Sequence, residues 1–473
     1  MTRTDTLKNG MEMLRKFFMG PIYPAVVGAL MLASHILNIP FYLNFINIFL
    51  ICLAFLVCDS VRPFVVVMCT YVFQVSTVTM GAAPDSPYYF LGGGRLVVVI
   101  LLFCAVVASM AVFCVRNRIF TLENLRSLPI LPAALALSVA LLLNGAFSSA
   151  WSFSDVSFGA IQILSFVLIF YFFVLGFKKE RGEELCSCFA YVSAIIALVV
   201  VLETFYMYLT SETLIVDGSV VKEQVLYGWG IWNTAGQQLV VTIPMIYYGV
   251  MKNKYPWFYF TVATLATGAA VLTLSRNALI FSVMAYGISA IIACFCGKRQ
   301  KAFRILIPVG ILLILAAAFL FREKILSILA DYVSRGLSDN GRFDLWREGF
   351  DAFLKAPVLG SGFFGVYPDV PLTGDIFPWM AHNTVIEILG AMGVLGALAY
   401  GYYRFETAKV FFRKPSLEKT MLGIGILTIL FGSLLDNFIF YSLPMLYYSV
   451  ALAIAFHPDL NRKSEELAEA LSM

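Results

Sequence analysis

Residues 256–296 read "PWFYFTVATLATGAAVLTLSRNALIFSVMAYGISAIIACFC", and this stretch decides the fold class. It contains two apolar runs joined around Arg276, each long enough to cross the hydrocarbon core of a bilayer as a helix. Lipid admits only helices and closed barrels as spanning structures, and continuous apolar runs differ from the alternating pattern of barrel strands. The stretch therefore predicts two membrane-spanning helices with a positive charge in the turn between them.

The composition of the whole chain supports the same class. Of its 473 residues, 60% are hydrophobic and 13% are charged, and the mean hydropathy is +0.85, which lies outside the usage of soluble domains. We predict an all-α, polytopic integral membrane protein with about fourteen transmembrane helices, because each apolar run of about 20 residues can span the bilayer. These spans are predicted near residues 18–38, 41–58, 62–80, 95–115, 129–149, 156–177, 186–209, 235–251, 256–274, 277–296, 304–321, 382–404, 417–436 and 438–457.

Basic residues indicate the orientation of the chain. They gather in alternate loops, such as residues 177–184 and 296–304, and in the N-terminal segment. Lysine and arginine collect on the cytoplasmic side of membrane proteins, so these loops and both termini are predicted to be cytoplasmic. The N-terminal segment lacks a convincing small-residue cleavage site and is predicted to be an uncleaved first span.

Two regions follow from this topology. Residues 1–234 are expected to hold N-terminal transmembrane helices with an outer loop near 210–234. Residues 235–473 are expected to hold the remaining helices and a large extracytoplasmic loop at 322–381. The large loop holds six basic and eight acidic residues, a density of charge far above the chain average.

Arg276 and His382 are the first candidates for chemistry. A charge near membrane depth usually pairs with another group or marks a substrate path, although an arginine can also extend to the lipid headgroups. His382 ends the large outer loop and opens the next span, on the same predicted face as Arg276. An imidazole can accept a proton near neutral pH, and the alternative is a histidine that caps or supports the helix.

The large outer loop also predicts an amphipathic helix. Aromatic residues recur at helical spacing until Pro357 stops the pattern, and they are Phe343, Trp346, Phe350 and Phe353. Arg342 belongs to this helix, and arginine is a preferred partner for phosphate because its planar group donates two hydrogen bonds at once. The alternative is a solvated interfacial charge. The sequence contains no metal-ligand spacing and no phosphate-binding glycine loop, so we expect no metal and no cofactor.

Three stretches together resemble the O-antigen ligase and polymerase superfamily of bacterial envelope glycan enzymes. They read "LTLSRNAL" at 272–279, "GRFDLWREGFDAFLKAPVLGSGFFGVY" at 341–367 and "AHNTVIEILGAMGVLGAL" at 381–398. The resemblance extends over about residues 225–400, and its strength lies in the order and spacing of the motifs. The residues that match the superfamily pattern are Ser275, Arg276, Asn277, Arg342, Trp346, Pro357, Gly360, Gly362, His382 and Asn383.

One feature of the superfamily pattern is missing. Relatives often carry a second arginine before a "G-x-x-x-N" stretch, whereas this chain has Tyr227 before Gly228. Lys222 or Arg342 is the candidate for the missing charge. The resemblance implies a fold like that of type C glycosyltransferases, with Tyr227, Trp346 and Asn383 as supporting residues.

The resemblance also implies the reaction. A glycan would pass from an undecaprenyl diphosphate carrier to an acceptor hydroxyl, by inverting transfer without metal or nucleotide. His382 would be the catalytic base, and Arg276, Arg342 and Lys222 would bind the diphosphate. The implied location is the bacterial cytoplasmic (inner) membrane, with the active site on its outer face.

Three readings of the function remain open at this point. We expect polymerisation of lipid-linked repeat units into a surface polysaccharide, with ligase-type transfer of a finished glycan as the close alternative. A lipid-linked oligosaccharide transporter is the more distant alternative, although such folds generally show repeated halves and midplane charges. The expected partners are a lipid-linked oligosaccharide donor, a glycan acceptor and membrane lipids. A flippase and a chain-length regulator are candidate protein partners, and nucleic acid is not expected.

Overall fold

The computed structural model describes most of the chain as helices. It describes residues 3–37, 40–69, 95–149, 151–212, 214–216, 219–220, 225–227, 230–320, 322, 341–367, 378, 380–413 and 415–460. Besides helices and loops, the described residues include two pairs of two-residue antiparallel strands between residues 215 and 231. These strands are β1 Ile215–Val216, β2 Ser219–Val220, β3 Leu226–Tyr227 and β4 Gly230–Ile231. The all-α class predicted from the sequence is confirmed.

The helices fall along the chain in two groups of similar size. The first group is α1 Arg3–Met19, α2 Ile22–Ile36, α3 Pro40–Val57, η1 Arg62–Cys69, α4 Arg95–Arg116, α5 Leu122–Arg126, α6 Leu131–Leu142, α7 Phe153–Ile163, η3 Leu164–Leu168, α8 Ile169–Gly176, η4 Phe177–Lys179 and α9 Gly182–Thr210. The second group is α10 Trp232–Lys252, α11 Pro256–Leu272, α12 Arg276–Phe295, α13 Gln300–Leu320, α15 Arg342–Lys355, α16 Thr384–Phe412, α17 Leu417–Gly432, η6 Phe438–Phe440 and α18 Ser442–Ala455.

Short polar side chains begin several of these helices. The hydroxyl of Ser275 accepts a hydrogen bond from the Ala278 amide at the start of α12, and Ser416 does the same for Lys419 in α17. Such caps satisfy backbone amides that have no partner within the helix. The two helices therefore begin directly after Ser275 and Ser416.

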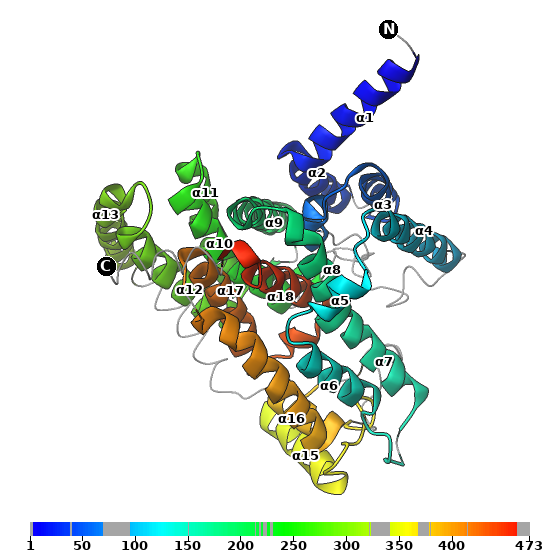
Figure 1. Cartoon of the computed structure of the whole chain (residues 1–473). Coiled ribbons are helices and arrows are strands. Elements are labelled where there is room, and N and C mark those ends of the chain that lie inside the picture. Colours follow the sequence, from blue (N-terminus) through cyan, green and yellow to red (C-terminus); the bar gives the residue numbers. More distant parts are fainter. Residues whose placement is uncertain are drawn as a thin grey trace, which may run out of the picture.

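Helix α10 lies at the centre of the bundle, in contact with α9, α11, α12 and α17. Its side chains from Ala235 to Met251 are all buried. Small residues permit this close packing, since a Cβ added to Gly249 would lie 2.4 Å from the Tyr259 ring of α11. Figure 1 shows α1 extending away from the bundle, and α15 beside α16 in another part of the molecule.

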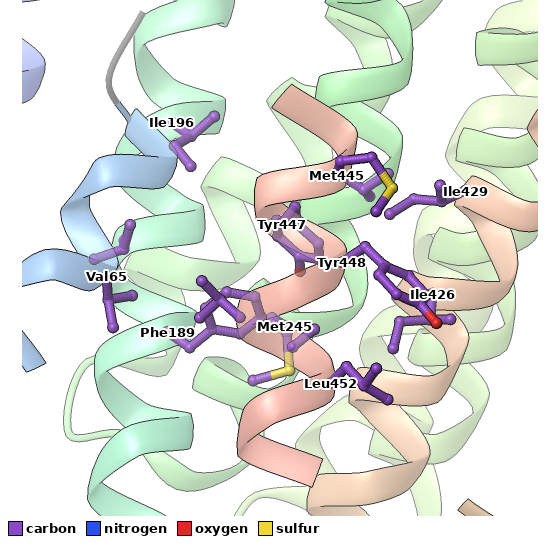
Figure 2. Close-up of a cluster of buried hydrophobic side chains, with 14 of the residues drawn as sticks. Val65, Phe189, Ile196, Met245, Ile426, Ile429, Met445, Tyr447, Tyr448 and Leu452 are labelled. Carbon is purple, nitrogen blue, oxygen red and sulfur yellow. The ribbon is translucent and has the colours of Figure 1, made fainter. Parts of the chain in front are cut away.

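A cluster of buried apolar side chains joins the two halves of the chain (Figure 2). Met245 of α10 lies beside Phe189 of α9 and Tyr447 of α18, and the cluster also includes Ile426 of α17 and Val65 of η1. Phe189 and Tyr447 are in direct ring contact, with centroids 4.7 Å apart. Helices from before and after the short β-strands therefore share one core.

Four helical segments of the described chain are long and apolar enough to cross a membrane. They are Phe153–Lys179, Gly182–Thr210, Arg276–Phe295 and Thr384–Phe412, and a fifth is counted if the pair Asn9–Met19 and Ile22–Ile36 forms one bent span. Shorter apolar helices are Phe45–Val57, Ile100–Arg116, Leu131–Leu142, Pro256–Leu272 and Pro444–Ala455. These helices indicate a multi-pass membrane protein, while the count of fourteen spans and the division at residue 234 stay predictions.

Two predicted spans differ in form from the expectation. The span expected at 18–38 is preceded by a 67° bend between α1 and α2, where Gly20 and Pro21 interrupt the helix. The span expected at 62–80 begins instead as the 3₁₀-helix η1, and its residues after Cys69 lie outside the described part of the chain. The amphipathic helix expected before Pro357 is confirmed as α15.

Candidate functional site

His382 lies immediately before α16 and is held by a buried carboxylate. Its Nδ1 is 2.9 Å from Oδ1 of Asp436, whose side chain is 2% exposed, whereas the His382 side chain is 33% exposed. The backbone of His382 is in the left-handed region, with φ of 51°. The imidazole is therefore fixed on one side by Asp436 and open on the other. Sequence reasoning missed Asp436.

Asp436 also connects His382 to the start of α10. Its Oδ2 accepts a hydrogen bond of 3.3 Å from Nδ2 of Asn233, and its Oδ1 accepts one of 2.8 Å from the Asn437 amide. A buried carboxylate is costly unless its oxygens are hydrogen-bonded, and here both oxygens have partners. One carboxylate thus joins the residue before α16, the first turn of α10 and the turn before η6.

A second buried carboxylate lies close to His382 in the chain. Glu387 is fully buried in the first turn of α16, and its Oε2 accepts a 2.7 Å hydrogen bond from the Ala381 amide. Glu387 therefore fixes the backbone directly before His382.

Asn383 is a helix cap. Its Oδ1 accepts hydrogen bonds from the amides of Val385 and Ile386, and its Nδ2 donates to the Leu434 carbonyl at 3.0 Å. The Thr384 amide adds a 2.9 Å bond to the Ser433 carbonyl. Asn383 therefore secures the start of α16 to the turn after α17, and this supports the position of His382.

Arg276 is the first residue of α12 and is half-buried. The start of α12 packs on the first turn of α10, because a Cβ added to Gly236 would lie 2.4 Å from Cβ of Ala278. Gly236 is one turn after Asn233, which bonds to Asp436. Arg276 and the His382–Asp436 pair therefore flank the same end of α10.

Tyr227 supports the fold beside this end of the bundle. It is fully buried in β3, and its hydroxyl shares a 2.8 Å hydrogen bond with Oγ1 of Thr204 in α9. Burial raises the pKa of the Tyr227 hydroxyl. Lys222 lies outside the described residues.

Arg342 and Trp346 lie on α15, which packs on the first half of α16. A Cβ added to Gly349 would lie 2.6 Å from Cγ2 of Ile386, and the Tyr367 hydroxyl donates to the Leu345 carbonyl at 2.8 Å. Trp346 meets Phe343 edge to face at 5.3 Å, and its buried Nε1 has no hydrogen-bond partner among the described residues. Arg342 is half-buried at the first position of the helix. Both residues therefore lie on a helix that packs against α16, the helix that follows His382.

The segment "PVLGSG", residues 357–362, fills a break in α16. The helix is interrupted at Gly393, where φ is 63° and ψ is −163°. The Ser361 amide donates to the Gly390 carbonyl at 2.8 Å, and the Pro357 carbonyl accepts from the Val394 amide at 2.9 Å. Backbone groups freed by a break within a membrane helix need such partners. The proline and glycines of this motif are therefore structural.

The other side of this segment rests on the connection between α6 and α7. Oδ1 of Asp155 accepts a 2.9 Å hydrogen bond from the Phe364 amide, and Oδ1 of Asn144 accepts a 3.3 Å bond from the Phe363 amide. Asp155 also closes a capping box with Ser152 at the start of α7. Sequence reasoning missed Asp155, although the Ser-x-x-Asp spacing before an apolar run is a helix-start signal.

Gly360→Ala is expected to destabilise the protein by about 2 kcal/mol or more, because left-handed backbone and overpacking both oppose a side chain there. Gly360 has φ of 74°, and its Cβ would lie 2.2 Å from the carbonyl carbon of Ala391. The measurement is the thermal melting temperature in detergent. Gly268→Ala in α11 is the control, since nothing lies within 4 Å of its added Cβ. Equal melting temperatures for Gly360→Ala and wild type would refute the structural role of the motif.

The described residues contain no group of three or more His, Cys, Asp or Glu side chains that could hold a metal ion. The site offers a histidine that is hydrogen-bonded to a carboxylate, at the same end of α10 as the arginine that begins α12. This combination can remove a proton from a hydroxyl and stabilise negative charge on a leaving group.

Fold and site together define a multi-pass helical membrane protein with a histidine–aspartate pair at one end of its bundle. Residues 261–401 match the family model described as O-antigen ligase, and the match includes Arg276, Arg342 and His382. The resemblance to the O-antigen ligase and polymerase superfamily is therefore confirmed over this segment. A comparison with curated proteins gives no match. The family match supports ligase- or polymerase-type glycosyl transfer with a lipid-linked sugar.

Proposed function

We propose that this protein polymerises undecaprenyl-diphosphate-linked oligosaccharide repeat units into a surface polysaccharide. The reaction is an inverting glycosyl transfer that needs no metal, on the outer face of the bacterial cytoplasmic membrane. The observation that carries the proposal is the hydrogen bond between His382 and Asp436, at the start of a helix inside the family-matched segment. Arg276 begins a helix that packs on the same end of α10.

His382 is the proposed catalytic base. With the Nδ1 proton donated to Asp436, the lone pair on Nε2 is available for the proton of an acceptor hydroxyl. As that proton moves to Nε2, the hydroxyl oxygen attacks the anomeric carbon of the donor sugar. The bond between that carbon and the diphosphate oxygen breaks, and its electron pair leaves with the lipid diphosphate. The buried Asp436 carboxylate stabilises the resulting imidazolium.

Arg276 is the proposed diphosphate ligand. A guanidinium donates paired hydrogen bonds to phosphate oxygens and stabilises the charge that develops on the leaving oxygen. Arg342 and Lys222 are the proposed sources of the second positive charge, because Tyr227 occupies the position where relatives carry an arginine and is bonded to Thr204. Asn383, Tyr227 and Trp346 have supporting roles in holding the helices around the site.

The experiment that tests this proposal uses purified protein in proteoliposomes. One sample receives lipid-diphosphate-linked oligosaccharide alone, and a second also receives a different glycan or lipid acceptor. A ladder of products in the first sample is expected for a polymerase. Transfer only in the second sample would replace polymerisation by the ligase alternative. No turnover in either sample, together with movement of the carrier between leaflets, would exclude the enzyme and favour a transporter.

Asp436→Asn is expected to lower the turnover rate by roughly 100-fold or more, because the wrong histidine tautomer is favoured when the carboxylate is lost. KM for the donor should change little, since Asp436 is proposed to act through His382. The measurement is steady-state product formation from labelled donor. Asp344→Asn on the exposed face of α15 is the matched control and should keep wild-type activity. Loss of donor affinity without loss of turnover rate would contradict this positioning role.

A further inference from the structure

A cavity lies at the opposite end of α10 from His382. Its volume is about 1300 Å³. It opens between the break that joins α1 to α2, the start of α9, and the turns that follow α10 and α12. Helix α10 has 21 residues. At a rise of 1.5 Å per residue it extends about 30 Å. The start of α9, which is long and apolar enough to cross a membrane, lines the cleft, so the cleft lies at one end of a candidate membrane span.

The cleft has an excess of positive charge. The charged side chains in its lining are Arg62, Arg181, Glu183, Glu184, Lys254 and Arg299. Glu184 forms ion pairs with both Arg62 and Arg181, at 3.3 and 3.5 Å. Lys254 and Arg299 are exposed side chains from two further turns, and they give the lining more basic than acidic groups. An anion is therefore the electrostatically favoured occupant.

Aromatic and apolar side chains form the remaining wall of the cleft. Tyr255, Trp257 and Phe258 line it, and their side chains are 65%, 46% and 38% exposed. Tryptophan and tyrosine are enriched at the headgroup level of membranes, where one end of the ring is apolar and the other is wet. An occupant that fits both walls has an anionic head and apolar chains.

We infer that this cleft binds an anionic phospholipid. Its phosphate lies between Lys254 and Arg299, and its acyl chains lie against the aromatic wall. Basic pockets between membrane helices are suited to such headgroups, and each nearby lysine or arginine contributes to their attraction. Inorganic phosphate can pair with the basic side chains but has no apolar part to contact the aromatic wall. A zwitterionic phospholipid has acyl chains for this wall but no net negative charge for the basic side chains. This site is independent of the proposed glycosyl transfer.

The test is quenching of tryptophan fluorescence by brominated lipids in mixed micelles of the full chain. The Trp257 signal is the difference between wild type and Trp257→Phe. Brominated phosphatidylglycerol is expected to quench this signal at a much lower mole fraction than brominated phosphatidylcholine. The double variant Lys254→Ala/Arg299→Ala should need a roughly tenfold or higher mole fraction of phosphatidylglycerol, because two cations are lost.

The control is a double variant that removes two basic side chains outside the cleft. Arg126 and Lys179 are exposed at the same end of the bundle but do not line the cleft, so Arg126→Ala/Lys179→Ala should leave the quenching curve unchanged. Equal quenching by the two brominated lipids would overturn the inference. So would equal weakening in both double variants, or displacement of the lipid by millimolar inorganic phosphate alone. Melting temperatures near wild type in each variant confirm that folding is intact.

Discussion

His382→Gln is expected to lower the rate of glycosyl transfer by roughly 100- to 10,000-fold, the range contributed by general acid–base catalysis. Glutamine can keep a hydrogen bond to Asp436 but cannot accept the proton of an acceptor hydroxyl at neutral pH. The local structure should therefore survive while the chemistry is lost. The measurement is single-turnover conversion of labelled lipid-linked oligosaccharide in proteoliposomes.

His35→Gln is the matched control for this variant. His35 lies on α2, where its ring faces Tyr206 at 6.1 Å, far along the chain from the Asp436 carboxylate. We expect His35→Gln to retain wild-type turnover. A His382→Gln protein that melts like wild type and transfers at the wild-type rate would remove His382 from the mechanism.

Arg276→Gln is expected to lower transfer by roughly 100- to 1000-fold, as for other groups that stabilise charge in a transition state. Glutamine can donate hydrogen bonds but carries no charge to offset the departing diphosphate. Arg276→Lys should recover part of the rate, because it restores charge without the paired donors of the guanidinium. The measurement is the same single-turnover assay, with the donor concentration varied to separate binding from chemistry.

Arg347→Gln serves as the control for Arg276, since Arg347 is an exposed arginine on α15. Its loss should change neither rate nor donor affinity. If Arg276→Gln and Arg347→Gln behave alike, Arg276 is an arginine that extends to the lipid headgroups. The proposal would then lose its diphosphate ligand.

The class of the fold could be predicted from the sequence, because a helix that spans a bilayer needs a continuous apolar run of about 20 residues. The sequence also predicted the helix at α15 from aromatic spacing. It did not predict the break at Gly393, because residues 388–399 around it are all apolar or glycine and contain no proline to mark a break. The break is stable only since residues 357–362, a separate segment, supply its missing hydrogen-bond partners.

Only part of the candidate site was predicted, because some of its residues come together through contacts between distant segments. Arg276 and His382 stand out as polar residues beside apolar runs. Asp436 and Asn233 are 203 positions apart in the chain, and Asp436 is 54 positions from His382, so no local pattern relates them. The one sequence signal was an acidic residue in the short turn "DNFIFYS". Tertiary packing of α10, α16 and α17 is what brings these groups together.

The most direct test of the central claim is photo-crosslinking with a lipid-diphosphate-linked oligosaccharide that carries a photoreactive group on its first sugar. Labelled peptides from proteoliposomes are identified by mass spectrometry. We expect labelled peptides from the starts of α10 and α16, around Asn233 and His382. These labels should disappear when unlabelled donor competes. Labels confined to the cleft around Trp257, or labels that unlabelled donor does not displace, would contradict the central claim.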